Sequence, residues 1–414
     1  MIDVAITGAG VVSPLGNDLA TFGRRMFAGE SGIRDLRGGR VPARFPVPYG
    51  GLVERDALAM PDDLSPAAAS SVTDDRLFAA CATEEALAGL PRGLPVDGVI
   101  YGTSQGLDFP VVSESFRRAT PSADGPFPWG DLRPEGAIEA IAELLERRGH
   151  GVLKAARQIA VSSACATGNQ ALGLAFQRIR HGVWRRALAG AVDSRLTMAN
   201  LMSFYMLSAL MAEDCPAETA SRPFSIDRGG FVRSEGAASF VLERREEAEA
   251  RGAEILAVIS GYAHTSDAYH FTEGRPEGTA VIAAIAGAIH DAGLEPSAID
   301  AVSAHGTSTP LNDRVETFAL KQVFGERAYR VPVTALKSQL GHGTVAAGAV
   351  EAVSCLLMLR QQRLAPTINY REDEVDPECD LDYVPNRARP ARIRRMLSNS
   401  FGFGGHNACL VFER

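Results

Sequence analysis

The sequence lacks the closely spaced cysteine pairs that zinc sites and disulfide frameworks need. Its six cysteines are scattered over 414 residues, and no two of them form a CxxC pattern. Neither a disulfide scaffold nor a metal site is therefore expected. A reduced protein of the cytoplasm fits this cysteine usage best.

An excess of positive charge is also missing. The chain has 42 Lys and Arg residues against 50 Asp and Glu residues, which gives a formal net charge of -8. Proteins that bind nucleic acid neutralise its phosphates with a basic surface. The charge balance therefore argues against nucleic acid as a partner.

Long apolar runs are absent as well. No stretch approaches the length needed to span a bilayer, and the opening residues MIDVAITGAG enter a strand pattern instead of a signal peptide. We expect no membrane role. The GAG of this opening does not predict a dinucleotide site, because Ser13 stands where that fingerprint has its third glycine and Pro14 follows at once.

The composition that remains is that of a large globular body. The chain is 46% hydrophobic, and its 41 glycines and 23 prolines are spread along it rather than gathered in a linker. Apolar strand-like runs alternate with amphipathic helical patterns, which indicates an α/β fold in layers. Residues 34–58 are expected to form an irregular surface excursion. Residues 103–130 are expected to form a long loop with a function or a partner, because such loops are uncommon inside compact bodies.

The two parts of the chain repeat one pattern. QIAVSSAC in the first part is matched by VPVTALKSQLGHG in the second, since each is an apolar run that ends at small or reactive residues. We interpret this as an internal duplication with a cleft between the halves. The expected division is 1–250 for the first half and 251–414 for the second.

Cys165 lies at the centre of the most informative stretch, residues 158–182. A short buried strand is expected to end just before this cysteine, and apolar residues recur at helical spacing after Gly168. At a helix N-terminus, unpaired backbone N–H groups and the helix dipole favour thiolate over thiol. We therefore expect a nucleophile at neutral pH, with an ordinary buried cysteine as the alternative.

Two histidines share the surroundings of this cysteine. His305 in AHGTSTPLND and His342 in KSQLGHGTVAAG each follow an apolar run and lie among small residues. A lone histidine of this kind is more often structural, but two of them with a thiol predict a catalytic constellation. A zinc site made by Cys165, His305 and His342 is the chemical rival, although the sequence offers no obvious carboxylates to orient such ligands.

Five motifs carry a resemblance to a known family. They are SSACATG, DAYHFT, AHGTSTPLND, LKSQLGHGTVAAGAVE and SNSFGFGGHN, and together they extend over nearly the whole chain. In order and spacing they resemble the β-ketoacyl-acyl carrier protein synthases, the elongating condensing enzymes of type II fatty acid and polyketide synthesis. The resemblance implies a thiolase-like fold, with two duplicated halves stacked as α-β-α-β-α layers, and a dimer.

The resemblance also implies a reaction and its residues. Cys165 would take an acyl group from a carrier-protein thioester, and His305 and His342 would promote decarboxylation of a malonyl thioester and stabilise its enolate. No cofactor is implied, because the substrates arrive on the phosphopantetheine of an acyl carrier protein. The implied supporting residues are Lys337 with its partner Glu351, Phe403 as gate, Phe231 and Phe401 at the malonyl pocket, and Thr272, Thr307 and Thr309 along the pantetheine arm. Each threonine has an ordinary turn residue as its alternative.

The chemistry of these roles also follows from the residues. Thioester exchange passes through an oxyanion, for which the backbone N–H groups of Cys165 and Phe403 are the natural donors. Gly402, Gly404 and Gly405 let that backbone come close.

Several departures from the family pattern concern docking. Residues 65–75, SPAAASSVTDD, carry none of the lysines and arginines that the resemblance leads one to expect there. Ser208 stands where an arginine is common, and His406 stands where threonine is usual. These changes suggest a specialised synthase, of a polyketide or polyene pathway, with another docking surface or a heterodimeric partner. Arg275, close to Thr272, is our candidate for carrier-protein docking, with a solvated loop arginine as the alternative.

Two other functions stay open at this point. A non-catalytic companion subunit that determines chain length in a heterodimer would usually lack the nucleophile, so Cys165 counts against it. An acyltransferase or thioesterase would use the thiol without condensation, but simple hydrolysis needs only one base. The two histidines and Lys337 therefore favour condensation.

Overall fold

A single ten-stranded sheet forms the centre of the computed structural model, which describes residues 2–58, 74–103, 136–150 and 157–414. Its strand order is β11-β10-β14-β15-β9-β1-β8-β6-β4-β5. The first half of the chain supplies β1 (Val4–Val12), β4 (Gly98–Gly102), β5 (Gln158–Val161), β6 (Arg186–Asp193) and β8 (Gly236–Arg244). The second half supplies β9 (Ala257–Ser266), β10 (Ala301–Ser303), β11 (Val333–Thr334), β14 (Arg395–Gly402) and β15 (His406–Glu413).

These two sets of five strands have the same topology. In the first set, β8 pairs antiparallel with both β1 and β6, and β4 runs parallel to both β6 and β5. In the second set, β15 pairs antiparallel with both β9 and β14, and β10 runs parallel to both β14 and β11. The sets meet where β1 pairs antiparallel with β9. Strand β5 is therefore the counterpart of β11, and β4 is the counterpart of β10.

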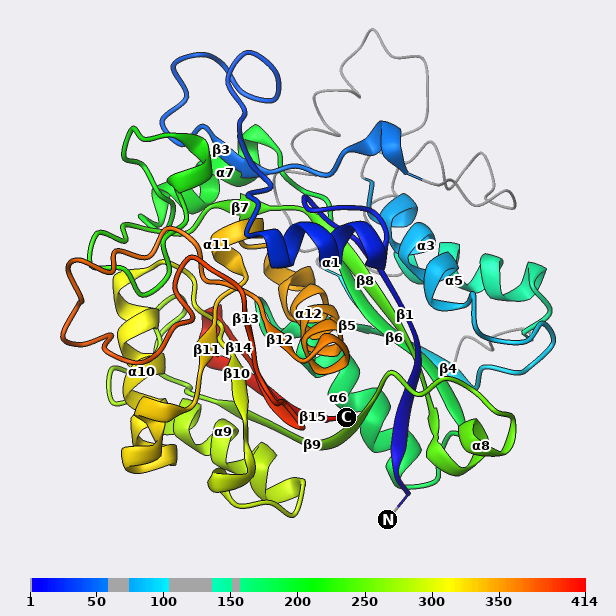
Figure 1. Ribbon diagram of the computed structural model, residues 1–414. Coiled ribbons are helices and arrows are strands. Elements are labelled where there is room, and N and C mark those ends of the chain that lie inside the picture. Colours follow the sequence, from blue (N-terminus) through cyan, green and yellow to red (C-terminus); the bar gives the residue numbers. More distant parts are fainter. Residues whose placement is uncertain (1, 59–73, 104–135, 151–156) are drawn as a thin grey trace, which may run out of the picture.

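Helices cover the sheet in layers (Figure 1). The central helices α6 (Thr167–Arg180) and α12 (Ala347–Gln361) contact each other, and each contacts strands of both halves. Outside them, α3 (Asp75–Ala86) and α5 (Gly136–Arg147) pack on the first half, and α9 (Thr279–Asp291) and α10 (Pro310–Phe324) cover the second. Because α6 and α12 contact strands of both halves, the two five-stranded parts of the sheet form the two β layers, and the expected α/β fold of stacked α-β-α-β-α layers is confirmed.

The remaining elements are short. They are helices α1 (Leu19–Ala28), α7 (Met198–Met206), α8 (Arg245–Ala250) and α11 (Lys337–Leu340), a small sheet of β2 (Ile33–Asp35), β3 (Tyr49–Gly51) and β7 (Arg233–Ser234), and the pair β12 (Arg363–Leu364) and β13 (Arg389–Pro390).

Two glycines let the central helices cross at close range. A Cβ on Gly168 of α6 would lie 2.3 Å from the backbone nitrogen of Ala349, and a Cβ on Gly348 of α12 would lie 2.9 Å from the backbone nitrogen of Asn169. Real side chains do not approach backbone so closely. Both glycines are therefore required where α6, which starts just after Cys165, packs on α12.

The structure corrects two expectations from the sequence. Residues 34–58 are not only a surface excursion, because β2 and β3 lie there and Leu36, Val41 and Val47 are buried in a small core that they share with residues 196–231. Helix α10 was not expected, since its buried face carries the polar residues Asp313 and Glu316 in addition to apolar ones, which interrupts the apolar period. The predicted loop 103–130 lies, from residue 104 onward, outside the described residues, as does most of the docking stretch 65–75.

One helical segment, Thr344–Gln361, is long and apolar enough to cross a membrane by length and composition alone. The expectation that no stretch reaches this length is therefore wrong. The segment is, however, 83% buried inside the molecule and includes α12, so its apolar surface is covered by the protein's own core.

Candidate active site

The three reactive side chains predicted from the sequence line one cavity. Cys165 follows β5, His305 follows β10, and His342 follows β11 and the single turn of α11. The cavity has a volume of about 410 Å³ and is lined by all three. Cys165 and His342 lie 177 positions apart in the chain. They share one site because the turns that follow β5 and β11 lie against the same central helices.

The turn that carries Cys165 is tightly constrained. Ala164 adopts a left-handed conformation with φ of 48°, which is uncommon for a residue with a side chain. Hydroxyl groups hold the turn: the Ser163 N–H donates to Thr167 Oγ1 at 2.7 Å, and this hydroxyl donates to the Ala164 carbonyl at 2.6 Å. Helix α6 begins at Thr167, so Cys165 lies two residues before it, as the sequence predicts.

The resting state of this sulfur differs from our expectation. Cys165 is only 6% exposed, and burial raises the pKa of its thiol to about 11. The Lys337 ammonium, the Phe403 backbone N–H and the Arg233 guanidinium lower this pKa but do not offset the loss of water. The predicted resting thiolate is therefore wrong, because burial outweighs the charges and the N–H group that favour it.

The loop after β14 lies directly against the cysteine. The backbone N–H of Phe403 hydrogen-bonds the Cys165 sulfur. Gly402 makes this approach possible, because a Cβ there would lie 2.9 Å from the Cys165 backbone nitrogen and from the Ser163 carbonyl oxygen. Gly404 has a φ of 77°, a conformation that favours glycine. The loop therefore places a backbone donor beside the sulfur.

The two histidine rings lie edge to face, with centroids 5.3 Å apart. The Phe401 ring lies 5.7 Å from that of His305, and the Phe231 ring lies 5.1 Å from that of His342. Burial and the Lys337 charge hold the pKa of both imidazoles well below the usual value. Both histidines are therefore neutral at pH 7, and a neutral imidazole offers one N–H donor.

Lys337 determines which nitrogen of His305 carries the proton. Its ammonium group donates to His305 Nδ1 at 3.3 Å, to the His305 carbonyl at 2.6 Å and to Glu351 Oε1 at 2.5 Å. All three ammonium protons are thus used. Because Nδ1 accepts, the imidazole proton is on Nε2. The ion pair with Glu351 is buried on both sides.

Sequence reasoning missed the carboxylates that hold the His305 loop. Glu316 on α10 accepts from the backbone N–H groups of His305 at 2.9 Å and Gly306 at 2.8 Å, and burial raises its pKa to about 7. Asp313, one turn earlier, accepts from the Thr307 N–H at 2.9 Å. The signal in the sequence is the i, i+3 spacing of two acidic residues soon after AHGTST, on what would be one face of a helix.

Hydroxyl groups line the same cavity toward its mouth. Thr272, Thr307 and Thr309 all belong to its wall, and the hydroxyls of Thr307 and Thr309 are 2.8 Å apart. The rim residue Ser208 also lines the cavity and is exposed. A slender polar arm that enters here would meet hydroxyl groups on its way to Cys165.

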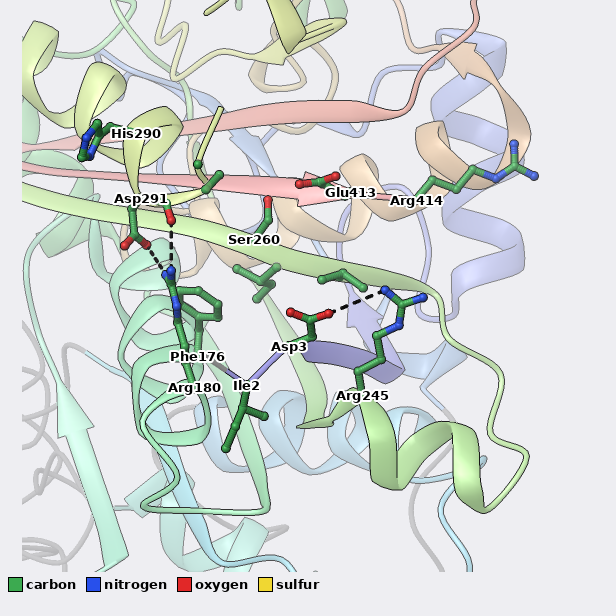
Figure 2. A pocket seen from close by; sticks show the side chains of 14 residues that line it. Ile2, Asp3, Phe176, Arg180, Arg245, Ser260, His290, Asp291, Glu413 and Arg414 are labelled. Atoms are coloured by element: carbon green, nitrogen blue, oxygen red, sulfur yellow. Dashed lines mark hydrogen bonds and ion pairs between the residues drawn. The ribbon is translucent and has the colours of Figure 1, made fainter. Parts of the chain in front are cut away.

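A second cavity of about 430 Å³ lies at the opposite ends of the strands, beside the start of β1 and the end of β15. Figure 2 shows two pairs among its charged side chains, Arg180 with Asp291 at 2.7 Å and Arg245 with Asp3 at 3.8 Å. Among the described residues that line it there is no thiol. Of these two cavities, only the first is lined by a thiol among the described residues.

The zinc alternative finds no support in the geometry. Within the described parts of the chain, no three His, Cys, Asp or Glu side chains are placed so that they could hold a metal ion. Cys165, His305 and His342 line one space without converging on one point, as separate partners of an organic substrate would.

Comparisons with known proteins agree with this site. The family model described as beta-ketoacyl synthase, N-terminal domain, matches residues 153–248, and the C-terminal domain model matches residues 256–371. The chain is 35% identical to 3-oxoacyl-[acyl-carrier-protein] synthase 2 of Synechocystis sp., over 99% of this chain and 98% of the relative. It is 36% identical to the protein of that name from Staphylococcus aureus, over 100% and 98%.

Solved structures show the same similarity. A beta-ketoacyl synthase from Burkholderia phymatum superposes with a TM-score of 0.88 at 31% identity, over the whole of both chains. The ketosynthase complex AntDE:AntF, which includes a type II polyketide synthase acyl-carrier protein, has a TM-score of 0.85 at 32% identity, over 100% of this chain and 99% of that one. The ishigamide ketosynthase/chain length factor has a TM-score of 0.84 at 30% identity, with the same coverage.

Proposed function

The chain belongs to the β-ketoacyl synthase family, and from this premise we propose that Cys165, His305 and His342 carry out its condensation reaction. The thiolase-like fold expected from the sequence is confirmed. The protein is an acyl-transferring enzyme that forms carbon–carbon bonds, extending an acyl group with malonyl-acyl carrier protein in fatty acid or polyketide synthesis.

One observation supports the assignment of residues: a thiol, a backbone N–H and two neutral imidazoles surround a single cavity. Acyl transfer needs a nucleophile and an oxyanion donor, and decarboxylation needs donors for an enolate. Cys165 with Phe403 meets the first requirement. His305 with His342 meets the second.

In the first step, the Cys165 sulfur attacks the carbonyl of an acyl thioester on the phosphopantetheine of the carrier. The carbon–sulfur bond to the carrier breaks, and the thiol proton of Cys165 moves to the departing pantetheine sulfur. The Phe403 N–H that contacts the resting sulfur lies where the oxyanion forms. The product is a neutral thioester, which burial, like the neutral thiol before it, does not penalise.

In the second step, the bond between the carboxylate and the methylene carbon of the malonyl thioester breaks, and carbon dioxide leaves. Negative charge develops on the thioester oxygen, where imidazole N–H groups of His305 and His342 stabilise it. The methylene carbon then attacks the acyl carbonyl on Cys165. The bond to Cys165 breaks, and the released thiolate takes up one proton per cycle.

The other site residues keep the roles that we proposed from the sequence. Phe231 and Phe401 border the malonyl group, because each ring packs on one of the histidines. Phe403 is the gate beside Cys165. Thr272, Thr307 and Thr309 hold the pantetheine arm, as their place in the cavity wall supports.

The alternatives are not favoured. A companion subunit without catalysis would not need Cys165, His305 and His342 around one cavity, nor Lys337 hydrogen-bonded to both His305 and Glu351. A simple acyltransferase needs no pair of enolate donors. Both functions remain outcomes of the experiment below.

Partners and assembly complete the proposal. We propose an acyl carrier protein as the partner, and either a homodimer or a heterodimer with a ketosynthase-like chain-length subunit; β5 at the edge of the central sheet offers a strand for pairing. We propose a cytoplasmic protein with no cofactor, membrane or nucleic-acid partner. The halves 1–250 and 251–414 are proposed as the two units of the duplication, which the matching strand topologies support.

Intact-mass analysis of the protein with acyl- and malonyl-loaded carrier proteins tests the function. We expect the mass of the enzyme to rise by the acyl group, and the carrier then to gain a β-ketoacyl group with loss of carbon dioxide. Acylation without condensation would indicate an acyltransferase. No acylation in the presence of active partner subunits would indicate a non-catalytic companion.

A further inference from the structure

A fully buried arginine lies directly behind His342, and the reaction steps above do not use it. Arg233 of β7 is 1% exposed, and its guanidinium is surrounded by hydrogen-bond acceptors. It donates from Nε to Asn200 Oδ1 at 2.9 Å, and from Nη1 to the His342 carbonyl at 3.2 Å and Thr344 Oγ1 at 2.9 Å. Nη2 lies 3.4 Å from an Asp193 carboxylate oxygen.

The loop that these contacts hold is strained. Thr344, two residues after His342, has a φ of 40°, in the left-handed region that a β-branched residue avoids. Such a conformation persists only where its surroundings determine it. Here the Thr344 hydroxyl accepts from Arg233 and donates to Asp193, so both members of the buried ion pair hold the strained residue.

The backbone of His342 is tied to the same strand. Its N–H donates to the Val232 carbonyl at 2.6 Å, and its carbonyl accepts from the Ser234 N–H at 3.0 Å in addition to Arg233. On the other side, the Arg233 guanidinium lies over the Phe204 ring at 5.3 Å, and Phe204 contacts both Phe231 and Phe403. One side chain thus connects the histidine loop with the aromatic wall of the cavity.

Burying an arginine with a carboxylate is a poor source of stability, because the desolvation of both charges offsets their attraction. A role beyond stability is therefore to be sought in what the arginine touches. We propose, on the basis of the proposed function, that Arg233 is a positioning residue for the malonyl step, which fixes the loop of His342 and places positive charge behind its imidazole.

The charge has a defined direction of effect. The groups that face His342 are Lys337 of α11, Arg233 of β7, the neutral ring of His305 and the Cys165 turn, with Asp193 behind Arg233. Burial, Lys337 and Arg233 all lower the pKa of His342. Removal of Arg233 therefore raises that pKa, so that the imidazole becomes protonated and loses function at a higher pH than in the wild type.

Three variants separate position from charge. Arg233→Leu removes both the hydrogen bonds of the guanidinium group and its charge. Asp193 keeps Arg195 at 3.6 Å as its partner. Arg233→Lys keeps the charge but loses the planar set of N–H donors. Arg186→Leu is the matched control, because Arg186 is also a buried arginine paired with a carboxylate, Glu243 at 2.6 Å, but it lies at the other end of β6 from Asp193.

We expect Arg233→Leu to lower malonyl-carrier decarboxylation and condensation by about tenfold to a hundredfold, the range for a misplaced catalytic group. Acyl loading of Cys165, measured by intact mass, should fall by no more than about threefold, since Arg233 is the smallest of three influences that lower the Cys165 pKa. The acid limb of the decarboxylation profile should move to higher pH in Arg233→Leu and stay in place in Arg233→Lys. Arg186→Leu should leave both reactions near wild-type rates.

Equal losses of loading and decarboxylation in Arg233→Leu, or an unmoved acid limb, would overturn the inference. A selective loss in Arg186→Leu would do the same. Should Arg233→Leu fail to fold, Thr344→Ala removes the anchored hydroxyl and keeps the charge; it should lower decarboxylation more than loading, and an equal loss of both would count against us. A wild-type protein that neither loads nor decarboxylates would refute the proposed function itself.

Discussion

The two halves of this molecule share a strand topology but hold their reactive residues by different means. The Cys165 turn follows β5 and is held by neutral hydroxyl groups, chiefly that of Thr167. The His342 loop follows the counterpart strand β11, and buried charges surround it: Arg233 with Asp193, and Lys337 with Glu351. The duplicated scaffold therefore holds the two turns of one site by electrostatically different means.

The difference matches the chemistry that we propose for each half. In this proposal Cys165 alternates between a neutral thiol and a neutral thioester, so a buried turn held by neutral groups suits it in both resting states, even with the Lys337 and Arg233 charges nearby. The histidine half meets a substrate that carries negative charge throughout the step, first on the carboxylate and then on the enolate. Cations near the imidazoles favour that charge and keep the rings neutral, which leaves their N–H groups available as donors.

The largest expected effect comes from removing the nucleophile. Cys165→Ser should abolish acyl transfer, whereas Cys165→Gln should stop condensation and leave malonyl decarboxylation detectable, because the histidine half is intact. Peptide mass spectrometry of the acylated protein locates the acyl group, and Cys215→Ser, at a half-buried cysteine away from the cavity, is the control. An acyl group on any other cysteine would refute the assignment.

Removing a histidine should affect only the second half of the reaction. His305→Ala and His342→Ala should each leave an acyl-Cys165 intermediate and lower condensation by roughly two to four orders of magnitude, the range for a lost proton-transfer or oxyanion group. His264→Ala is a suitable control, since His264 is exposed on β9 and does not line the cavity. If loading and condensation fell in parallel, the two halves would not divide the work as proposed.

The pKa of the Cys165 thiol tests whether this turn holds a neutral sulfur in the resting enzyme. A thiol pKa of about 11 leaves roughly one sulfur in ten thousand ionised at pH 7. Alkylation of Cys165 by iodoacetamide should therefore be slow at pH 7 and rise about tenfold per pH unit up to pH 9. The rate is followed by intact mass, with glutathione as the reference thiol. Fast alkylation with a midpoint near pH 7 would show that a resting thiolate exists after all.

The smallest effect concerns docking, for which the second half supplies the candidate charge. Arg275 follows the cavity residues Thr272, Glu273 and Gly274, and its guanidinium lies 5.0 Å from the Tyr269 ring. Arg275→Glu should raise KM for a carrier-protein substrate several-fold, and less at high salt, because an acidic partner loses an attractive charge at the mouth. Turnover of an N-acetylcysteamine thioester should change little.

A matched charge reversal elsewhere on the surface shows whether the effect of Arg275→Glu depends on its position. Arg360→Glu makes the same change at the exposed end of α12, and we expect it to leave both substrates unaffected. An equal loss on both substrates in Arg275→Glu would indicate a structural role for Arg275. No loss on either substrate would remove it from the docking surface.

Much of this site could be predicted because its signals are local in the chain. Small residues after an apolar run mark Cys165, His305 and His342, and each of these signals needs only a few neighbours in sequence. The glycines of the loop after β14 are of the same kind, since the need for close approach is visible in GFGG itself. The strand and helix alternation similarly follows from short periodic patterns.

Other properties depend on residues that only folding brings together. The pKa of Cys165 could not be predicted from its place before a helix, because burial by the rest of the chain outweighs the helix N-terminus. The helix α10 was missed because its polar face is buried against loops that it holds. The partners of Arg233 lie 33 to 111 positions away, at Asn200, Asp193, His342 and Thr344.

Residue types and their close neighbours in the chain therefore indicate which side chains we propose to react, since reactivity begins with residue type and with small neighbours that leave room for a substrate. The tertiary structure alone decided in which state these groups wait: thiol rather than thiolate, neutral rather than charged imidazole. The physical reason is that a protonation state depends on water exclusion and on charges at distances of a few ångströms, and both are set by packing between distant segments.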